Sequence, residues 1–275
     1  MKLSAVILSF NSKRYLEHCI RQLIAALEML EGPYEIFVCE NGSSDGSVDI
    51  LKSLEAEFPE AVKGIYFTTN RGTTVSRNVA LSRSSGDYVL IIDSDTYVNF
   101  DAIRFLIERL IDEPRCGIAV PTLTYPDGRY QISVDRFPTL IHKARRFFML
   151  KNMENQVDRS GGLSESRVVD YAISAFWIFR RDVLEKVGLL DERIFYSPED
   201  VDFSIRIWKA GYYIKYFPQV SVIHDAQEIS RAKGVKINIF TLSHLKGLLY
   251  LFVKHRYAFG LRGLYHRIGR AYNVN

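Results

Sequence analysis

The chain has little cysteine and no long apolar run. Its 275 residues include only three cysteines, which are widely spaced and form no Cys-x-x-Cys pair. Neither a disulfide framework nor a cysteine-rich zinc site is indicated, so we expect a reducing, cytosolic setting. The strongly apolar stretch from Gly247 to Val253 is far shorter than the ~20 residues that cross a bilayer. No signal peptide is expected either, because the N-terminus leads directly into a strand-like segment.

Motifs of four common enzyme classes are also absent. The sequence has no Gly-x-Gly-x-x-Gly after a strand-like run, no Walker A loop, no Gly-x-Ser-x-Gly elbow and no His-Glu-x-x-His. These absences weigh against dinucleotide-dependent, P-loop, serine-hydrolase and zincin chemistry.

Acidic residues are missing from the C-terminal part, where none follows Glu228. The composition as a whole, 47% hydrophobic and 25% charged, is that of a globular protein with a net charge of +4. Nine of the 36 basic residues lie after Glu228, which leaves 27 basic against 32 acidic residues before it. We therefore expect an acidic body with a basic helical tail, and we do not expect nucleic-acid binding.

Apolar residues in this tail recur at helical spacing beside cationic ones. They are Leu242, Leu245, Leu248, Leu249 and Phe252. Such a helix can lie on an anionic membrane surface. The alternative is a helix that docks on the preceding domain, and the pattern alone leaves both interpretations open.

The part before the tail alternates strand-like runs with segments of helical period. The strand-like runs are Leu3 to Ser9, Glu35 to Cys39, Val62 to Thr68, Tyr88 to Ile92 and Gly117 to Thr124. The helix predicted before Pro114 has Asn99 as its candidate N-cap. This alternation predicts an α/β protein with a mostly parallel sheet flanked by helices. From Pro138 to Arg167 the periodicity fades, which favours a loop.

Ligands of open α/β sheets collect beyond the carboxyl ends of the strands. One such end carries Asp93-Ser94-Asp95, directly after the apolar run that ends at Ile92. Mg2+ and Mn2+ take oxygen ligands, of which one or two come from protein carboxylates and others from substrate phosphate. The pair is a candidate metal and phosphate site, although a solvated turn or a helix cap accounts for the same residues.

Four other polar residues are candidates for a functional site. Glu40 opens a turn-rich segment, where it either accepts hydrogen bonds from a base or ribose or serves the turn itself. Arg77 suits phosphate or a planar heterocycle, and the alternative is a surface salt bridge. Asp200 begins a helix, where capping competes with a role in taking a proton. His224 follows a short strand and is either a metal ligand or a packed residue.

Several ordered segments together resemble the family 2 glycosyltransferases of the GT-A fold. The resemblance covers about Leu3 to Arg231, and it rests on AVILSFN (5–11), CENGSSDGS (39–47), residues 70–78, GDYVLIIDSD (86–95) and VGLLDERIFYSPEDVDFSIRIWKAG (187–211). Residues 127–133 and Arg180-Arg181 look like the rhamnosyltransferase-type subgroup of bacterial surface-polysaccharide enzymes.

The resemblance implies a GT-A (Rossmann-like) glycosyltransferase domain over residues 1–230 and a helical, amphipathic extension over 231–275. Residues 1–124 would form the nucleotide-binding half, and residues 125–230 the acceptor and catalytic half. The implied activity is an inverting transfer of a sugar from dTDP-rhamnose or a UDP-sugar to a hydroxyl of a glycan or a lipid-linked acceptor.

The same resemblance implies a role for particular residues. Asp200 would be the general base, and Trp177 and Glu199 would lie on the acceptor side. The implied cofactor is Mg2+ or Mn2+, held by Asp95, Asp93 and His224. The implied nucleotide-sugar-binding residues are Ser9, Asn11, Glu40, Asn70, Arg77, Asp93 and Ser94.

Three positions depart from the family pattern and leave the donor and acceptor open. Glu40 stands where the family usually has Asp, Thr73-Thr74 replaces a frequent Phe-Ala, and Ser174 replaces a frequent Gly. The main alternative function is a non-catalytic nucleotide-sugar or glycan-binding scaffold that the basic tail recruits to a membrane. A nucleotidyltransferase is disfavoured, because no glycine-rich basic loop follows the first strand. We expect a cytoplasmic enzyme, and if the tail binds a membrane, a peripheral one on the cytoplasmic membrane face.

Overall fold

The computed structural model describes residues 1–140, 164–226 and 239–270. Its main sheet has a parallel part in the order β3-β2-β1-β4, formed by β1 (Leu3–Ser9), β2 (Tyr34–Asn41), β3 (Val62–Phe67) and β4 (Tyr88–Asp93). It continues through β11 (Phe176–Arg180), β6 (Cys116–Thr124), β12 (Tyr213–His224) and β5 (Thr96–Tyr97). Because β11 is antiparallel to β4 and β6, the sheet is mixed although mostly parallel, as the sequence predicts.

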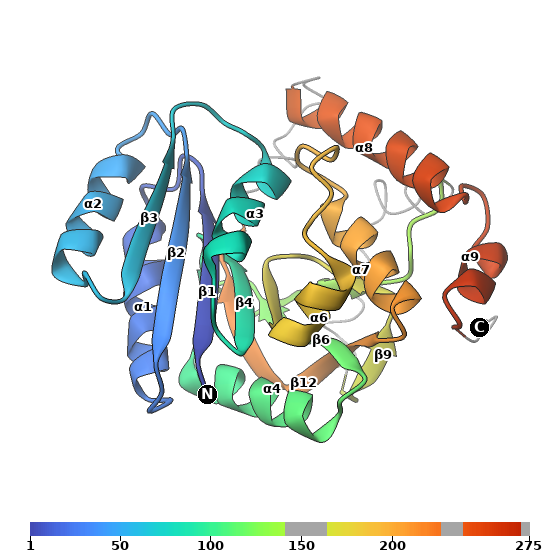
Figure 1. Cartoon of the computed structure of the whole chain (residues 1–275), viewed down its shortest axis with the longest axis horizontal. Coiled ribbons are helices and arrows are strands. Elements are labelled where there is room, and N and C mark those ends of the chain that lie inside the picture. Colours follow the sequence, from blue (N-terminus) through green and yellow to red (C-terminus); the bar gives the residue numbers. More distant parts are fainter. Residues whose placement is uncertain (141–163, 227–238, 271–275) are drawn as a thin grey trace.

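Helices cover both faces of this sheet (Figure 1). One apolar core lies between the sheet and α1 (Leu16–Glu28), α2 (Ser47–Glu57) and α4 (Phe100–Asp112). The other lies between the sheet and α3 (Thr73–Arg83), α6 (Arg181–Val187) and α7 (Glu199–Lys209). Successive strand residues alternate between the two cores: Leu90 and Ile92 of β4 enter the first, Val89 and Ile91 the second.

Local sequence signals account for several of the element boundaries. The Asn99 side chain accepts a hydrogen bond of 2.8 Å from the backbone N–H of Ala102, which confirms the predicted N-cap of α4. Gly211 follows α7 with φ +88°, a conformation that suits glycine at the end of a helix. Four short strands lie between β6 and β11 in the chain: β7 (Tyr130–Gln131), β8 (Val134–Asp135), β9 (Arg167–Val169) and β10 (Tyr171–Ala172).

The C-terminal helices pack on the domain and extend it. Figure 1 shows α8 (Ile239–His255) passing across one end of α7, with α9 (Arg262–Arg267) beyond it. A third apolar cluster joins the two parts through Val201 and Ile205 of α7 and Leu248, Leu251 and Phe252 of α8. The docking alternative for the tail is therefore observed. The predicted boundary at residues 230 and 231, and most of the predicted loop from Pro138 to Arg167, lie outside the described residues.

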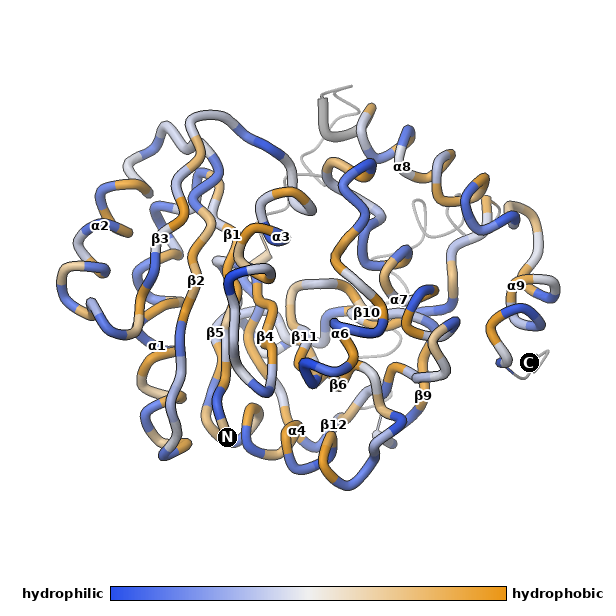
Figure 2. Tube along the Cα trace, viewed as in Figure 1, coloured by the Kyte–Doolittle hydropathy of each residue, from blue (hydrophilic) through white to orange (hydrophobic). Residues whose placement is uncertain are grey.

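None of the described helices is long and apolar enough to span a membrane. Apolar and polar stretches alternate along α8 rather than forming one continuous apolar segment (Figure 2).

Candidate active site

Three parallel strands end side by side at one edge of the sheet. The register places Leu8 of β1 beside Asp93 of β4, and Ser9 beside Glu40 of β2. Polar residues that are far apart in the sequence therefore meet at the carboxyl ends of the strands, where open α/β sheets bind ligands.

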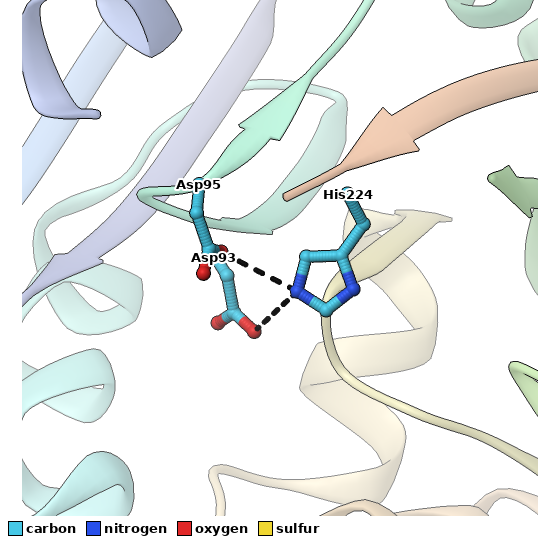
Figure 3. A group of neighbouring side chains, drawn as sticks. All are labelled: Asp93, Asp95 and His224. Carbon is cyan, nitrogen blue, oxygen red and sulfur yellow. Dashed lines mark ion pairs between the residues drawn. The ribbon is translucent and has the colours of Figure 1, made fainter. Parts of the chain in front are cut away.

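Asp93, Asp95 and His224 form a cluster at this edge, and Figure 3 shows their side chains converging. One ligand atom from each lies within 4.8 Å of the others. The Nε2 atom of His224 is 3.3 Å from Asp95 Oδ1 and 4.0 Å from Asp93 Oδ2. The pairing of β5 with β12, which sets Thr96 opposite His224, brings the histidine to the two carboxylates.

The surroundings of this cluster suit a divalent cation. The Nδ1 atom of His224 is 2.8 Å from the amide oxygen Oε1 of Gln131, which can accept the Nδ1 proton and so orients the ring with Nε2 toward the carboxylates. Burial raises the pKa of Asp93 against the opposing charge of Arg77, and the nearby Asp95 adds to the increase. Carboxylate crowding of this kind is relieved by a cation between the groups, and two carboxylates with an imidazole suit Mn2+ or Mg2+.

Arg77 of α3 is buried beneath the cluster, with 1% of its side chain exposed. Its Nη2 atom donates to Asp93 Oδ1 at 2.5 Å, and its Nη1 atom donates to Ser174 Oγ at 2.7 Å. The guanidinium also lies 3.5 Å from Glu199 Oε1. Arg77 thus connects the strand end that carries Asp93 to the start of α7.

Glu199 is buried at the first position of α7. Its carboxyl group accepts a hydrogen bond of 2.9 Å from Ser174 Oγ. Burial raises the pKa of Glu199 well above its usual range, and the adjacent Asp200 raises it further, while Arg77 opposes the increase. Ser174 therefore links Glu199 to Arg77.

Asp200 is half-buried in the first turn of α7, and its Oδ1 atom accepts the backbone N–H of Val201 at 2.8 Å. Tyr196 lies just before this helix. Burial raises the pKa of Tyr196 to about 12, and the charges of Glu199, Asp93, Asp200 and Asp95 contribute to the increase. The contacts of Arg77 with Asp93 and Glu199 place the metal-site candidates and the start of α7 at the same region.

The remaining nucleotide-sugar candidates shape the loops at this edge. Ser9 Oγ is 2.7 Å from Ser12 Oγ, and Asn11 Oδ1 accepts from the N–H of Ser44. Glu40 accepts from the N–H groups of Gly42 and Ser43, which matches the turn interpretation of this residue. Asn70 Oδ1 accepts from the N–H of Gly72, and Ser94 is buried between the two aspartates.

Trp177, which the resemblance implies on the acceptor side, is buried in the core and offers no exposed surface to an acceptor. Its ring has no exposed surface, stacks on Phe203 at 5.5 Å between centroids, and donates from Nε1 to the carbonyl of Ala172. On β11, Trp177 lies in the core between the sheet and α7, because alternate strand residues face opposite sides of the sheet.

Sequence reasoning missed three residues that the fold brings to the site. The charges of all four carboxylates contribute to the raised pKa of Tyr196, Gln131 orients His224, and Asn41 accepts from the N–H of Arg71 and the hydroxyl of Ser76. Asn41 stands at the end of β2, so its place at a strand end was a usable signal. The contact of Gln131 with His224 joins residues 93 positions apart, and no local pattern predicts it.

Comparison with known proteins identifies the family. Residues 4–188 match the family described as Glycosyl transferase family 2. The chain is 28% identical over 236 residues to the N-acetylglucosaminyl-diphospho-decaprenol L-rhamnosyltransferase of Mycobacterium tuberculosis, covering 81% of this chain and 75% of that enzyme. It is 25% identical over 222 residues to the probable glycosyltransferase YdaM of Bacillus subtilis, covering 79% of this chain and 49% of that protein.

Solved structures show the same fold. The mannosyltransferase PcManGT from Pyrobaculum calidifontis, in complex with GDP-Man and Mn2+, aligns with a TM-score of 0.63 at 17% identity, covering 97% of this chain and 68% of that chain. Residues 1–349 of S. aureus TarS, in complex with UDP-GlcNAc, align with a TM-score of 0.59 at 20% identity, covering 94% and 67%. The family match, the strand-end site and this fold together make the chain a member of glycosyl transferase family 2, a nucleotide-sugar-dependent glycosyltransferase.

Proposed function

We propose that the protein is an inverting glycosyltransferase that moves a sugar from a nucleoside-diphosphate sugar to an acceptor hydroxyl, with Asp200 as the general base. One observation carries the proposal: Arg77 joins the Asp93–Asp95–His224 cluster to the start of α7, because its guanidinium lies 2.5 Å from Asp93 Oδ1 and 3.5 Å from Glu199 Oε1. A single region can then hold the leaving diphosphate on one side and the attacking hydroxyl on the other.

The reaction is a single displacement at the anomeric carbon. The acceptor oxygen forms a bond to this carbon while the bond to the phosphate oxygen breaks, and its electron pair leaves with the nucleoside diphosphate. Asp200 takes the proton of the acceptor hydroxyl, a contribution of roughly 10²- to 10⁴-fold in rate. A divalent cation bound by Asp93, Asp95 and His224 would supply positive charge that offsets the charge of the diphosphate. One displacement inverts the configuration.

The donor we favour is dTDP-rhamnose, with a UDP-sugar as the alternative. The similarity to a rhamnosyltransferase that is named for a lipid-linked diphosphate acceptor supports rhamnose and a lipid-linked acceptor. A screen of nucleotide sugars with Mn2+ tests this, because a ligand that binds only the folded state raises the melting temperature. We expect the largest increase with dTDP-rhamnose, and a larger increase with a UDP-sugar would contradict this choice.

Asp200→Asn tests the general base with the donor that this screen identifies. We expect turnover to fall by roughly 10²- to 10⁴-fold while donor binding stays close to that of the wild type. Asp182→Asn is a matched control, because Asp182 is also the second residue of a helix. Near-normal turnover in Asp200→Asn would remove Asp200 from the mechanism. Donor binding by the wild-type protein without any turnover would instead favour the scaffold alternative.

We also propose that the outer face of α8 binds the cytoplasmic face of an anionic membrane, where a lipid-linked acceptor would lie. Four apolar side chains on this helix, Leu242, Leu245, Leu249 and Val253, are 57% to 69% exposed although their neighbours dock on the domain. Lys246 and Arg256 are exposed on the same helix or at its end, and residues 242–270 contain no acidic residue. Apolar area beside cationic charge suits an anionic lipid surface.

Vesicle flotation tests this membrane surface. The wild-type protein should float with vesicles that contain phosphatidylglycerol and less with vesicles of phosphatidylcholine alone. The double variant Leu245→Asn and Leu249→Asn should lose this binding, whereas Ile111→Asn changes an equally exposed residue of α4 and serves as the control. Equal flotation of the double variant and the wild type would contradict the proposal.

A further inference from the structure

The backbone of α8 lies directly against the segment that leads into α7. A Cβ atom at position 247 would overlap the carbonyl oxygen of Ser197 and come within 2.9 Å of Pro198 Cδ. Because only glycine lacks that atom, Gly247 permits the two backbones to touch. This contact is two to three residues before Asp200, on the N-terminal side of the proposed base.

Side chains of α8 also hold the chain further upstream. The hydroxyl of Tyr250 donates to Asp191 Oδ2 at 2.8 Å and accepts from Arg193 Nη1 at 3.2 Å. The ammonium group of Lys254 lies 2.6 Å from the same oxygen of Asp191. The segment from Asp191 to Pro198 is therefore attached to α8 along its length rather than at one point.

On the C-terminal side of Asp200, α8 holds α7 itself. Asp202 is fully buried, and its carboxylate lies 2.6 Å from Lys254 Nζ, 2.8 Å from His255 Nε2 and 3.0 Å from Arg206 Nε. Burial raises the pKa of Asp202, but the hydrogen bond from His255 and the charges of Arg206 and Lys254 outweigh it and lower the pKa to about 2. Two of its three partners come from the tail.

We propose that α8 positions Asp200 for proton transfer and that Gly247, Lys254 and His255 are positioning residues for the reaction. The proposal rests on the proposed role of Asp200 as the general base. The contacts through Ser197–Pro198 and through Asp202 bracket the base on both sides. A displacement of about 1 Å in a reacting group lowers the rate by as much as 10²-fold, so the fit of α8 sets the rate of transfer. The donor-side residues lie on strand ends whose register the sheet fixes.

Gly247→Ala in the full chain tests the backbone contact, with Gly260→Ala as the matched control, since a Cβ atom at position 260 meets nothing within 4 Å. We expect Gly247→Ala to lower kcat by about 10- to 100-fold while the KM for the donor stays within about twofold. Hydrogen exchange should become faster in peptides that cover residues 197–209 and stay unchanged in those that cover β1 and β4. Wild-type kcat with wild-type exchange at residues 197–209 would overturn the proposal.

The charged contacts give a second test that does not depend on the glycine. Lys254→Met should lower kcat with little change in donor KM, and the conservative variant Lys254→Arg should restore most of it. If Lys254→Met and Lys254→Arg both lose donor binding as strongly as they lose kcat, the defect is a general structural one. That result would overturn the positioning role. Asp200→Asn in the same assay separates the two proposals. Retained turnover in that variant contradicts the general base, whereas its loss together with a normal kcat in Gly247→Ala contradicts only the positioning role.

Discussion

Arg77 is a buried charge held by two carboxyl groups and one hydroxyl. Its contact with Asp93 fixes one oxygen of that carboxylate and leaves the other, Oδ2, on the side of His224. Its proximity to Glu199 extends the same network to the start of α7. The nucleotide role that the resemblance implies for Arg77 therefore remains a prediction, while the contacts indicate that it orients Asp93.

Arg77→Met should destabilise the protein strongly, because it leaves the Asp93 carboxylate without its buried partner. We expect a loss of about 3 to 5 kcal/mol in the free energy of unfolding, measured by urea denaturation. Arg21→Met is the control, since Arg21 pairs with Glu17 and Glu57 on the surface and solvent screens those contacts. Similar losses of unfolding free energy in the two variants would contradict a stabilising role for the buried contacts of Arg77.

Gln131→Leu tests how the metal-site candidates are oriented. The substitution removes the Gln131 amide oxygen that contacts Nδ1 of His224. Loss of such a supporting group weakens metal binding by about 10- to 100-fold. Titration of Mn2+ in the presence of the nucleotide measures this, with Gln219→Leu as a control at an exposed glutamine. Unchanged Mn2+ affinity would contradict the assignment of His224.

Turnover should stop in excess EDTA, and full activity there would contradict a role for the metal.

At the scale of elements, the turn before α3 presses against the segment before α7. Gly72 has φ +85°, and a Cβ atom there would overlap the carbonyl oxygen of Phe195. The N–H of Thr73 donates to this same oxygen at 2.6 Å. The turn that follows β3 is thus part of the structure that holds the start of α7.

Gly72→Ala should therefore destabilise more than Gly128→Ala. Both glycines have positive φ, +85° at Gly72 and +83° at Gly128, which alanine adopts only with backbone strain. At Gly72 the ψ of 172° lies in a region that is essentially restricted to glycine, so the strain there is larger. Only position 72 adds an overlap, because a Cβ atom at position 128 meets nothing within 4 Å. If Gly72→Ala and Gly128→Ala unfold at the same urea concentration, the close approach to Phe195 adds nothing to the loss of stability.

Helix and strand patterns in the sequence predicted most of the central elements. The apolar stripe of α1 and the cap at Asn99 are local features, so the expected helices are confirmed. The strands β1, β2 and β4 contain continuous apolar runs, which are typical of a sheet covered on both faces, whereas the edge strand β3 is partly exposed. The place of β11 between β4 and β6 depends on long-range pairing, which local periodicity does not encode.

At the scale of the whole molecule, the tail contributes to stability through Asp202. Its pKa is about 2 in the folded protein, below the ordinary value of 3.8, so its stabilising contribution is present above pH 4. This contribution, of about 2 kcal/mol, is lost as the pH falls from about 4 to 2. The difference in free energy of unfolding between the wild type and Asp202→Asn should narrow over that interval. A constant difference in urea denaturation from pH 7 to pH 2.5 would contradict this expectation.

The sequence by itself determined the α/β class, the order of the central elements and the carboxylates at the strand ends, because these depend on periodicity and residue type. Only the tertiary structure decided which candidates meet. It placed His224 beside Asp95, buried Trp177 in the core, turned Arg77 toward Asp93, and docked α8 on α7. Each of these contacts joins residues that lie far apart in the chain or depends on which face of an element a side chain occupies. Pairing of strands and packing of helices fix such contacts, whereas composition and local spacing do not.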